Sequence, residues 1–124
     1  MSDDNLYKLS NMLRQAEASK IVPDAVKAFF EFDEKVYADG HLSLKVKEAI
    51  AVAVAHVTQC PYCIEVHVQR FKAAGGTKEE MMEAILVAGS VRAGGTLSHG
   101  VNALNAWDRE KKPAEKATEP ECFC

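Results

Sequence analysis

Residues 43–67, SLKVKEAIAVAVAHVTQCPYCIEVH, decide the fold of this chain. The run begins with Ser43, a residue type that accepts hydrogen bonds from the first turn of a helix, and continues to about Thr58 without a helix breaker. Its centre, AIAVAVAHV, is apolar on every side, so we expect a central, buried helix over 44–58. Pro61 directly follows Cys60 and is typical of the first residue of a further helix. The stretch therefore predicts two helices joined by a short turn.

The preceding residues also have a helical period, and no segment alternates apolar and polar residues as a strand would. One amphipathic stripe runs over 6–16 and a second over 26–37. Ile21-Val22-Pro23 breaks the pattern between them, and Asp39-Gly40 ends the second stripe. The sequence thus predicts two helices before residue 43.

After the cysteines, glycines and capping residues indicate where helices end and begin. Gly75-Gly76 predicts the end of the helix that starts at Pro61, and Thr77 with Glu80 forms a capping box that opens the next one. Gly94-Gly95 then predicts a break between a fifth and a sixth helix. We therefore expect an all-α fold of about six helices.

Length and composition indicate one globular domain. The chain has 124 residues, of which 48% are hydrophobic and 27% charged, which is ordinary for a folded domain with a proper core. We expect this domain to span residues 1–110. Residues 111–124 begin with KKPAEKATEPE, which has no apolar face and predicts a flexible tail ending in Cys122 and Cys124.

Charge and hydropathy exclude several classes of function. The net charge of -3 comes without a Lys/Arg cluster, so a nucleic-acid surface is not expected. No apolar run approaches the roughly 18 residues of a membrane span. The first residues, MSDDNLYKLS, lack the pattern of a signal peptide, so we expect a cytoplasmic protein away from membranes. No glycine-rich phosphate loop or nucleotide fingerprint is present, and no cofactor is expected.

Cys60 and Cys63 are the residues most suited to chemistry. Two cysteines at this spacing can close a short disulfide, and in a reducing compartment such pairs are more often catalytic or metal-binding than structural. A helix N-terminus favours the thiolate, which is the reactive form. His67 lies one helical turn after Cys63 and is suited to exchanging a proton with it. Alternatively, His67 is only the polar member of an apolar face made by Ile64, Val68 and Phe71.

Glu48 lies within the apolar helix that precedes the cysteines. A buried carboxylate is costly unless it is paired or protonated. If the turn between Thr58 and Cys60 folds the two helices together, Glu48 faces His67 and the thiols and can relay a proton. Alternatively, Glu48 lies on a solvated edge of its helix beside Lys45 and Lys47.

The pattern Glu48-x11-Cys60-x2-Cys63-x3-His67, followed by a helix ending at Gly-Gly and by an Ala-Gly-Gly sequence, resembles the AhpD-like (alkylhydroperoxidase) group of the carboxymuconolactone decarboxylase superfamily. The resemblance covers roughly residues 20–108. It implies an all-helical domain that assembles into homotrimers or homohexamers. It also implies an enzyme of antioxidant defence, a thiol-dependent peroxidase or disulfide reductase acting on a peroxide or small disulfide.

The resemblance also implies roles for individual residues. Cys63 would react with the peroxide, Cys60 would resolve the product as a disulfide, and His67 with Glu48 would relay protons. An external thiol donor, a lipoyl-bearing or thioredoxin-like protein, would restore the dithiol. The residues themselves leave the attacking cysteine open, because the capping position favours Cys60 and the neighbouring His67 favours Cys63. Tyr62 stands where some peroxidase members have a second histidine. Lactone decarboxylation, the reaction that names the superfamily, would leave the cysteine pair unexplained.

A metal site is the alternative from a different class of function. His56, Cys60, Cys63 and His67 are nitrogen and sulfur donors of the kind that bind zinc. The chain would then be a thiol-based binding protein for a metal or metalloid such as zinc, copper or arsenic. Cys122 and Cys124 are possible accessory thiols, either to reduce the Cys60–Cys63 disulfide or to capture such an ion, or they are incidental.

Overall fold

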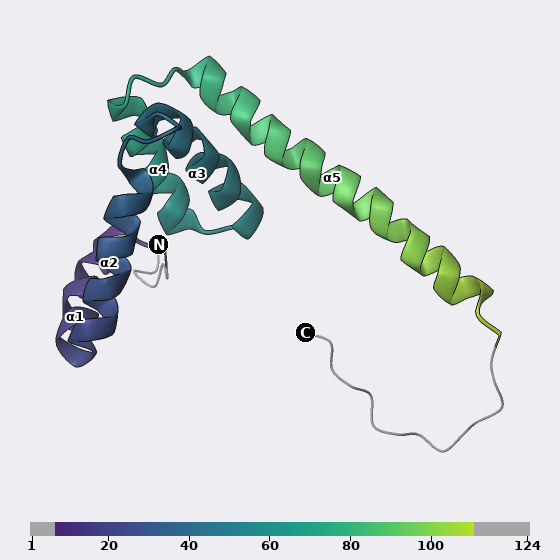
Figure 1. Ribbon diagram of the computed structural model, residues 1–124, viewed down its shortest axis with the longest axis horizontal. Helices are drawn as coiled ribbons and strands as arrows, with labels where there is room; N and C mark the ends of the chain where they lie inside the picture. Colours follow the sequence, from purple (N-terminus) through teal and green to yellow (C-terminus); the bar gives the residue numbers. More distant parts are fainter. Residues whose placement is uncertain (1–6, 111–124) are drawn as a thin grey trace, which may run out of the picture. The chain divides into compact units, whose positions relative to one another are not determined.

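The computed structural model describes residues 7–110, and all regular elements in this range are helices (Figure 1). They are a 3-10 helix η1 (Leu9–Arg14) and the α-helices α1 (Gln15–Ile21), α2 (Pro23–Tyr37), α3 (Leu44–Thr58), α4 (Pro61–Ala73) and α5 (Lys78–Asp108). No strand occurs between residues 7 and 110, which confirms the all-α prediction. Within the same range, no helix is both long and apolar enough to cross a membrane.

The boundaries of α3 and α4 lie where the capping residues predict them. The Ser43 hydroxyl accepts a hydrogen bond from the backbone N–H of Val46 at 3.3 Å, which satisfies one of the unpaired donors of the first turn of α3. Gln59 has a φ of 55° and ends α3 in the left-handed conformation. Cys60 then caps α4, whose first residue is Pro61. The predicted helix pair is thus confirmed.

The capping box before α5 is also confirmed. The Thr77 N–H donates to Oε1 of Glu80 at 3.2 Å, and the Glu80 N–H donates to the Thr77 hydroxyl at 3.1 Å. Gly76 precedes the box, and a Cβ at that position would lie 2.3 Å from the ring of Phe71. Because the Phe71 side chain is buried in the core, the chain can turn from α4 into α5 here only with glycine.

The prediction of a helix break at Gly94-Gly95 is wrong, because α5 continues through both residues to Asp108. Glycine retains its backbone N–H, so it weakens a helix interior by only about 1 kcal/mol per residue and does not end it as proline would. The described residues therefore contain five α-helices rather than six. The chain divides within α5 into two compact units, Met1–Arg92 and Ala93–Cys124.

The first unit is built from helix pairs. Helices α1 and α2 lie side by side, and so do α3 and α4, which make the most extensive pair (Figure 1). The buried apolar side chains are few: Val52, Ala55, Phe71 and Ala88. The expectation that α3 is buried all round is wrong for one face, because α4 and α2 cover only part of its surface and leave Ile50 and Val54 about half exposed.

Candidate active site

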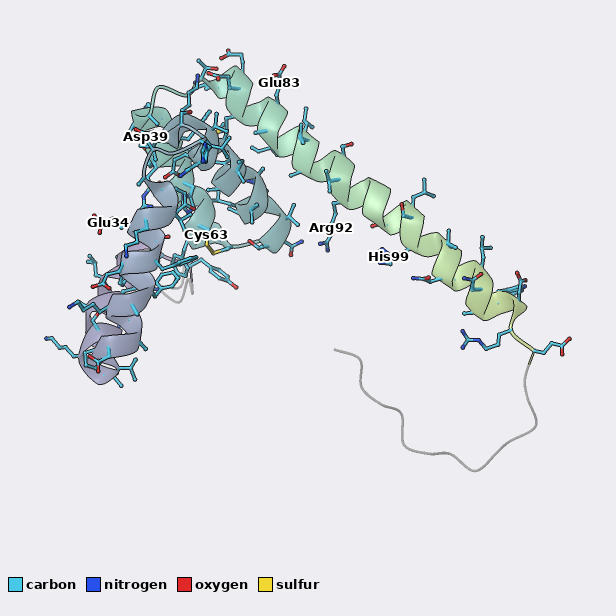
Figure 2. The ribbon with its side chains drawn as sticks, viewed as in Figure 1. Glu34, Asp39, Cys63, Glu83, Arg92 and His99 are labelled. Carbon is cyan, nitrogen blue, oxygen red and sulfur yellow. A yellow bond between two sulfur atoms is a disulfide. The ribbon has the colours of Figure 1, made fainter. Side chains whose placement is uncertain are left out.

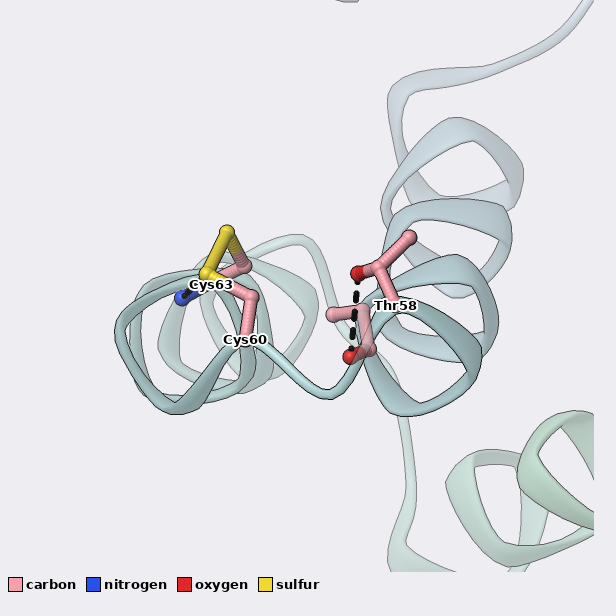
Figure 3. Close-up of a disulfide and its surroundings, with 4 residues drawn as sticks. Thr58, Cys60 and Cys63 are labelled. Atoms are coloured by element: carbon pink, nitrogen blue, oxygen red, sulfur yellow. Dashed lines mark hydrogen bonds between the residues drawn. A yellow bond between two sulfur atoms is a disulfide. The ribbon is translucent and has the colours of Figure 1, made fainter. Parts of the chain in front are cut away.

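The two cysteines of the CxxC pair are joined as a disulfide at the start of α4 (Figure 3). Cys60 occupies the capping position, and its Sγ accepts a hydrogen bond from the backbone N–H of Cys63 at 3.3 Å. Cys63 lies in the first turn of α4 (Figure 2). The Thr58 hydroxyl donates to the carbonyl oxygen of Ala55 and closes the end of α3 just before the turn. Capping by sulfur supplies the N–H contact that favours a thiolate in the reduced protein.

Glu48 and His67 form a hydrogen-bonded pair between α3 and α4. His67 Nδ1 lies 2.7 Å from Glu48 Oε2, and the Glu48 side chain is only 1% exposed. Of the two alternatives for Glu48, the structure has the buried, paired one. Its lysine neighbours bind elsewhere, Lys45 to Glu80 on α5 and Lys47 to backbone carbonyl oxygens at the end of α2.

The pairing decides which nitrogen of His67 can take part in proton exchange with sulfur. A carboxylate oxygen only accepts hydrogen bonds, so the imidazole proton is assigned to Nδ1, where it is donated to Glu48. Nε2 is then the nitrogen left to take or give a proton. Because the Glu48 carboxylate is buried, it holds the imidazole in one orientation without competition from water.

Two cavities adjoin His67 and the cysteine pair. The first, of about 370 Å³, is lined by Cys63, His67 and mainly apolar side chains of α2 and α3, among them Val36, Ile50 and Val54. The second, of about 400 Å³, is lined by both cysteines, by His67 and by polar side chains that include Asn11, Gln15, Asp33 and Arg70. Cys63 and His67 line both cavities, whereas Cys60 lines only the second. Cys63 and His67 are thus shared by an apolar and a more polar cavity.

Aromatic contacts complete the site, and the sequence analysis missed them. Tyr37, the last residue of α2, stacks on the His67 imidazole, with ring centroids 5.4 Å apart and an angle of 29° between the planes. Tyr62, between the cysteines, contacts the ring of Tyr7 and accepts a hydrogen bond from the Asn11 amide at 3.3 Å. Tyr7 and Tyr37 come from segments distant from the cysteines, and in the sequence they appear only as members of, or neighbours to, amphipathic stripes.

The four donors of the alternative zinc site do not form a metal centre. His56 Nδ1 contacts the carbonyl oxygen of Val52 at 2.7 Å, within its own helix. Between residues 7 and 110, no three His, Cys, Asp or Glu side chains are grouped so that they could hold a metal ion. Cys122 and Cys124 lie outside the described residues.

Comparison with known proteins places the chain in a family. Residues 23–106 match the carboxymuconolactone decarboxylase family. The chain belongs to this family. This confirms the resemblance at the level of the whole family. The cysteine pair and the Glu48–His67 pair both lie within the matched residues.

Two further proteins are similar to most of this chain. Uncharacterized protein 4 in the cox locus of Paracoccus denitrificans is 44% identical over 108 residues, which are 87% of this chain and 96% of that protein. The crystal structure of a protein from Methanobacterium thermoautotrophicum aligns with a TM-score of 0.63 and 31% identity, covering 73% of this chain and 97% of the other. The Methanobacterium protein therefore shares the helical fold over nearly its whole length.

Proposed function

We propose that this member of the carboxymuconolactone decarboxylase family is a thiol-dependent peroxidase of the AhpD-like type. The observation that carries the proposal is the Glu48–His67 pair, whose imidazole lines the same two cavities as the Cys63 sulfur. A dithiol supplies two electrons, and a histidine fixed by a buried carboxylate supplies the proton that the leaving oxygen needs. Lactone decarboxylation would use neither sulfur.

In the proposed reaction His67 Nε2 takes the proton of the Cys63 thiol, and the resulting thiolate attacks one oxygen of a hydroperoxide. The O–O bond breaks, an S–O bond forms, and the departing alkoxide takes a proton from His67 Nε2 to leave as an alcohol, or as water when the substrate is hydrogen peroxide. The Cys60 thiol then attacks the sulfenic acid of Cys63, which releases water and forms the disulfide. Two electrons and two protons from an external dithiol return both cysteines to the reduced form. We propose a lipoyl-bearing or thioredoxin-like protein as this donor.

Cys63 is proposed as the attacking cysteine on the basis of its surroundings. Both thiols are partly buried, so exposure does not distinguish them. Cys63 lines both cavities together with His67, whereas Cys60 reaches only the polar one. A peroxide that enters the apolar cavity therefore meets Cys63 and the imidazole but not Cys60, which lines only the polar cavity.

The first test is oxidation of the reduced protein. After anaerobic reduction, one equivalent of hydrogen peroxide or of an alkyl hydroperoxide is added, samples are alkylated over time, and the cysteines are mapped by mass spectrometry. We expect a Cys60–Cys63 disulfide to form at least about a hundredfold faster than the oxidation of free cysteine, because the site supplies general acid catalysis. If the protein thiols are oxidised no faster than free cysteine, the protein is not a peroxidase.

We further propose that the chain functions as a homotrimer or homohexamer. Its described residues bury few apolar side chains, while α3 exposes Ile50 and Val54. In the second unit α5 carries an apolar stripe at helical spacing, formed by the exposed side chains of Leu97, Val101 and Leu104. Exposed apolar faces of this extent are typical of protein interfaces. We propose that a second copy of the chain covers this stripe, because pairing of two α5 helices through identical stripes buries both stripes at once.

Light scattering after gel filtration tests this assembly. The wild-type protein is expected at three or six times the 13.6 kDa of one chain. Leu97→Glu places a charge within the stripe and is expected to shift the mass toward one chain, because burial of an unpaired charge opposes association. Asn102→Glu, which falls on the opposite side of the same helix, is the control and keeps the wild-type mass. A wild-type protein that is monomeric at tens of micromolar would contradict the proposal.

A further inference from the structure

Tyr37 is held in place by the two helices that carry the proposed proton relay. The Lys47 ammonium group of α3 donates hydrogen bonds to the carbonyl oxygens of Val36, at 2.8 Å, and of Ala38, on either side of Tyr37. Lys47 directly precedes Glu48, the partner of His67. Neighbouring residues of α3 therefore fix the end of α2 and the imidazole together.

From the other side, α4 contacts the same ring twice. The His67 imidazole stacks on it at 5.4 Å between centroids, and the Arg70 guanidinium carbon lies 5.9 Å from its centroid. Arg70 also faces Asp33 of α2 at 4.0 Å. Offset stacking of this kind favours one orientation of the two rings, and cation–π contact with Arg70 limits the movement of the tyrosine.

The phenol itself does not exchange protons near neutral pH. Partial burial raises the pKa of Tyr37 above its usual range, and the negative charges of Glu48 and Asp33 raise it further, against the smaller opposing effect of Arg70. An ordinary tyrosine already titrates near 10. Tyr37 therefore stays neutral at working pH, and its contribution comes from the ring rather than from the hydroxyl proton.

We propose that Tyr37 is a positioning residue for His67, which keeps the imidazole plane fixed so that Nδ1 stays on Glu48 while Nε2 faces the thiols. The inference rests on the proposed function for its purpose, since the fixed imidazole serves the thiol chemistry. The hydrogen bond to Glu48 alone holds one atom of the ring and still allows the ring to tilt about it. Stacking on Tyr37 removes this freedom and covers one face of the imidazole, and Tyr37 also lines the apolar cavity with Cys63 and His67.

The test compares Tyr37→Phe, which keeps the ring, with Tyr37→Leu and Tyr37→Met, which remove it. The first readout is the rate at which iodoacetamide alkylates the reduced cysteine pair between pH 5 and 9. Alkylation reports the thiolate and needs no peroxide activity, so it separates this inference from the proposed function. The groups around the two rings are Glu48 and Lys47 from α3, Asp33 from α2, and Cys63 and Arg70 from α4, and none of them is altered.

The ring-keeping variant is expected to remain within about twofold of the wild-type rate at every pH. The leucine and methionine variants are expected to react about tenfold more slowly at pH 7, with the midpoint of the profile moved to higher pH, because a mobile imidazole stabilises the thiolate less. Phe29→Leu removes an aromatic ring from the same helix at a residue that lines neither cavity. It is the control for general loosening of α2 and should leave the profile unchanged.

Two results would overturn the inference. One is an unchanged alkylation profile in the folded leucine or methionine variant. The other is a loss of alkylation rate in the phenylalanine variant equal to that in the leucine and methionine variants, because it would assign the effect to the hydroxyl. If both ring-removing variants fail to fold, nuclear magnetic resonance of His67 in the phenylalanine variant and the wild type decides: the same titration curve and the same Nδ1 proton signal are expected, and a difference refutes positioning by the ring alone.

Discussion

Cys63→Ser is expected to abolish formation of the disulfide and to slow peroxide consumption by a factor on the order of 10³, the scale seen when an enzyme loses its nucleophile. Serine keeps the size of the side chain but is a poor nucleophile at neutral pH, so the peroxide that reaches His67 through the apolar cavity finds no reactive sulfur. The loss is measured from initial rates of peroxide consumption with excess dithiol, in parallel with the alkylation map of the remaining cysteines.

Cys60→Ser is the matched control for this prediction. In this variant Cys63 still reacts with one equivalent of peroxide, but its sulfenic acid finds no partner thiol and accumulates, so it can be trapped with dimedone and weighed by mass spectrometry. The expected pattern is therefore one trapped adduct on Cys63 in Cys60→Ser and none in Cys63→Ser. The reverse pattern would make Cys60 the attacking cysteine, in keeping with the hydrogen bond that its sulfur accepts from the Cys63 N–H.

The local part of this site can be predicted from the sequence because short-range chemistry determines it. Ser43 starts α3 by accepting a hydrogen bond from within its own first turn, and Cys60-Pro61 starts α4 in a related way. A four-residue spacing on a helix is enough to associate Cys63 with His67. These interactions involve only neighbouring residues, so their pattern is visible without knowledge of the tertiary structure.

The rest depends on contacts between distant segments and could not be predicted. Whether Glu48 is buried depends on how α3 packs on α4, and the sequence alone left a solvated position equally open. Tyr37 resembles any other residue that ends an amphipathic stripe, and its role follows only from the approach of α2 to α4. Gly94-Gly95 was expected to end a helix, but glycine does so only where the backbone has reason to turn.

The pair formed by Glu48 and His67 leads to the second large effect, which concerns both rate and stability. His67→Ala is expected to slow disulfide formation by about 10²-fold or more, the typical contribution of a positioned acid or base. It should also lower the free energy of unfolding by about 3 kcal/mol, because removing one partner leaves the buried Glu48 carboxylate unpaired. Glu48→Gln keeps an oxygen that can accept from Nδ1, so we expect a smaller loss of stability, about 1 kcal/mol, and a rate loss of about tenfold.

The double variant separates a coupled pair from two independent residues. If the imidazole works through the carboxylate, adding Glu48→Gln to His67→Ala should cost no further rate and should restore stability, since the buried charge has been removed together with its partner. His56→Ala serves as the histidine control, because His56 contacts the Val52 carbonyl oxygen of its own helix and does not line either cavity. Stability is measured by urea unfolding of the oxidised protein and rate by the alkylation time course. Additive losses in both quantities would show that Glu48 and His67 act separately, and the relay would then have to be assigned to His67 alone.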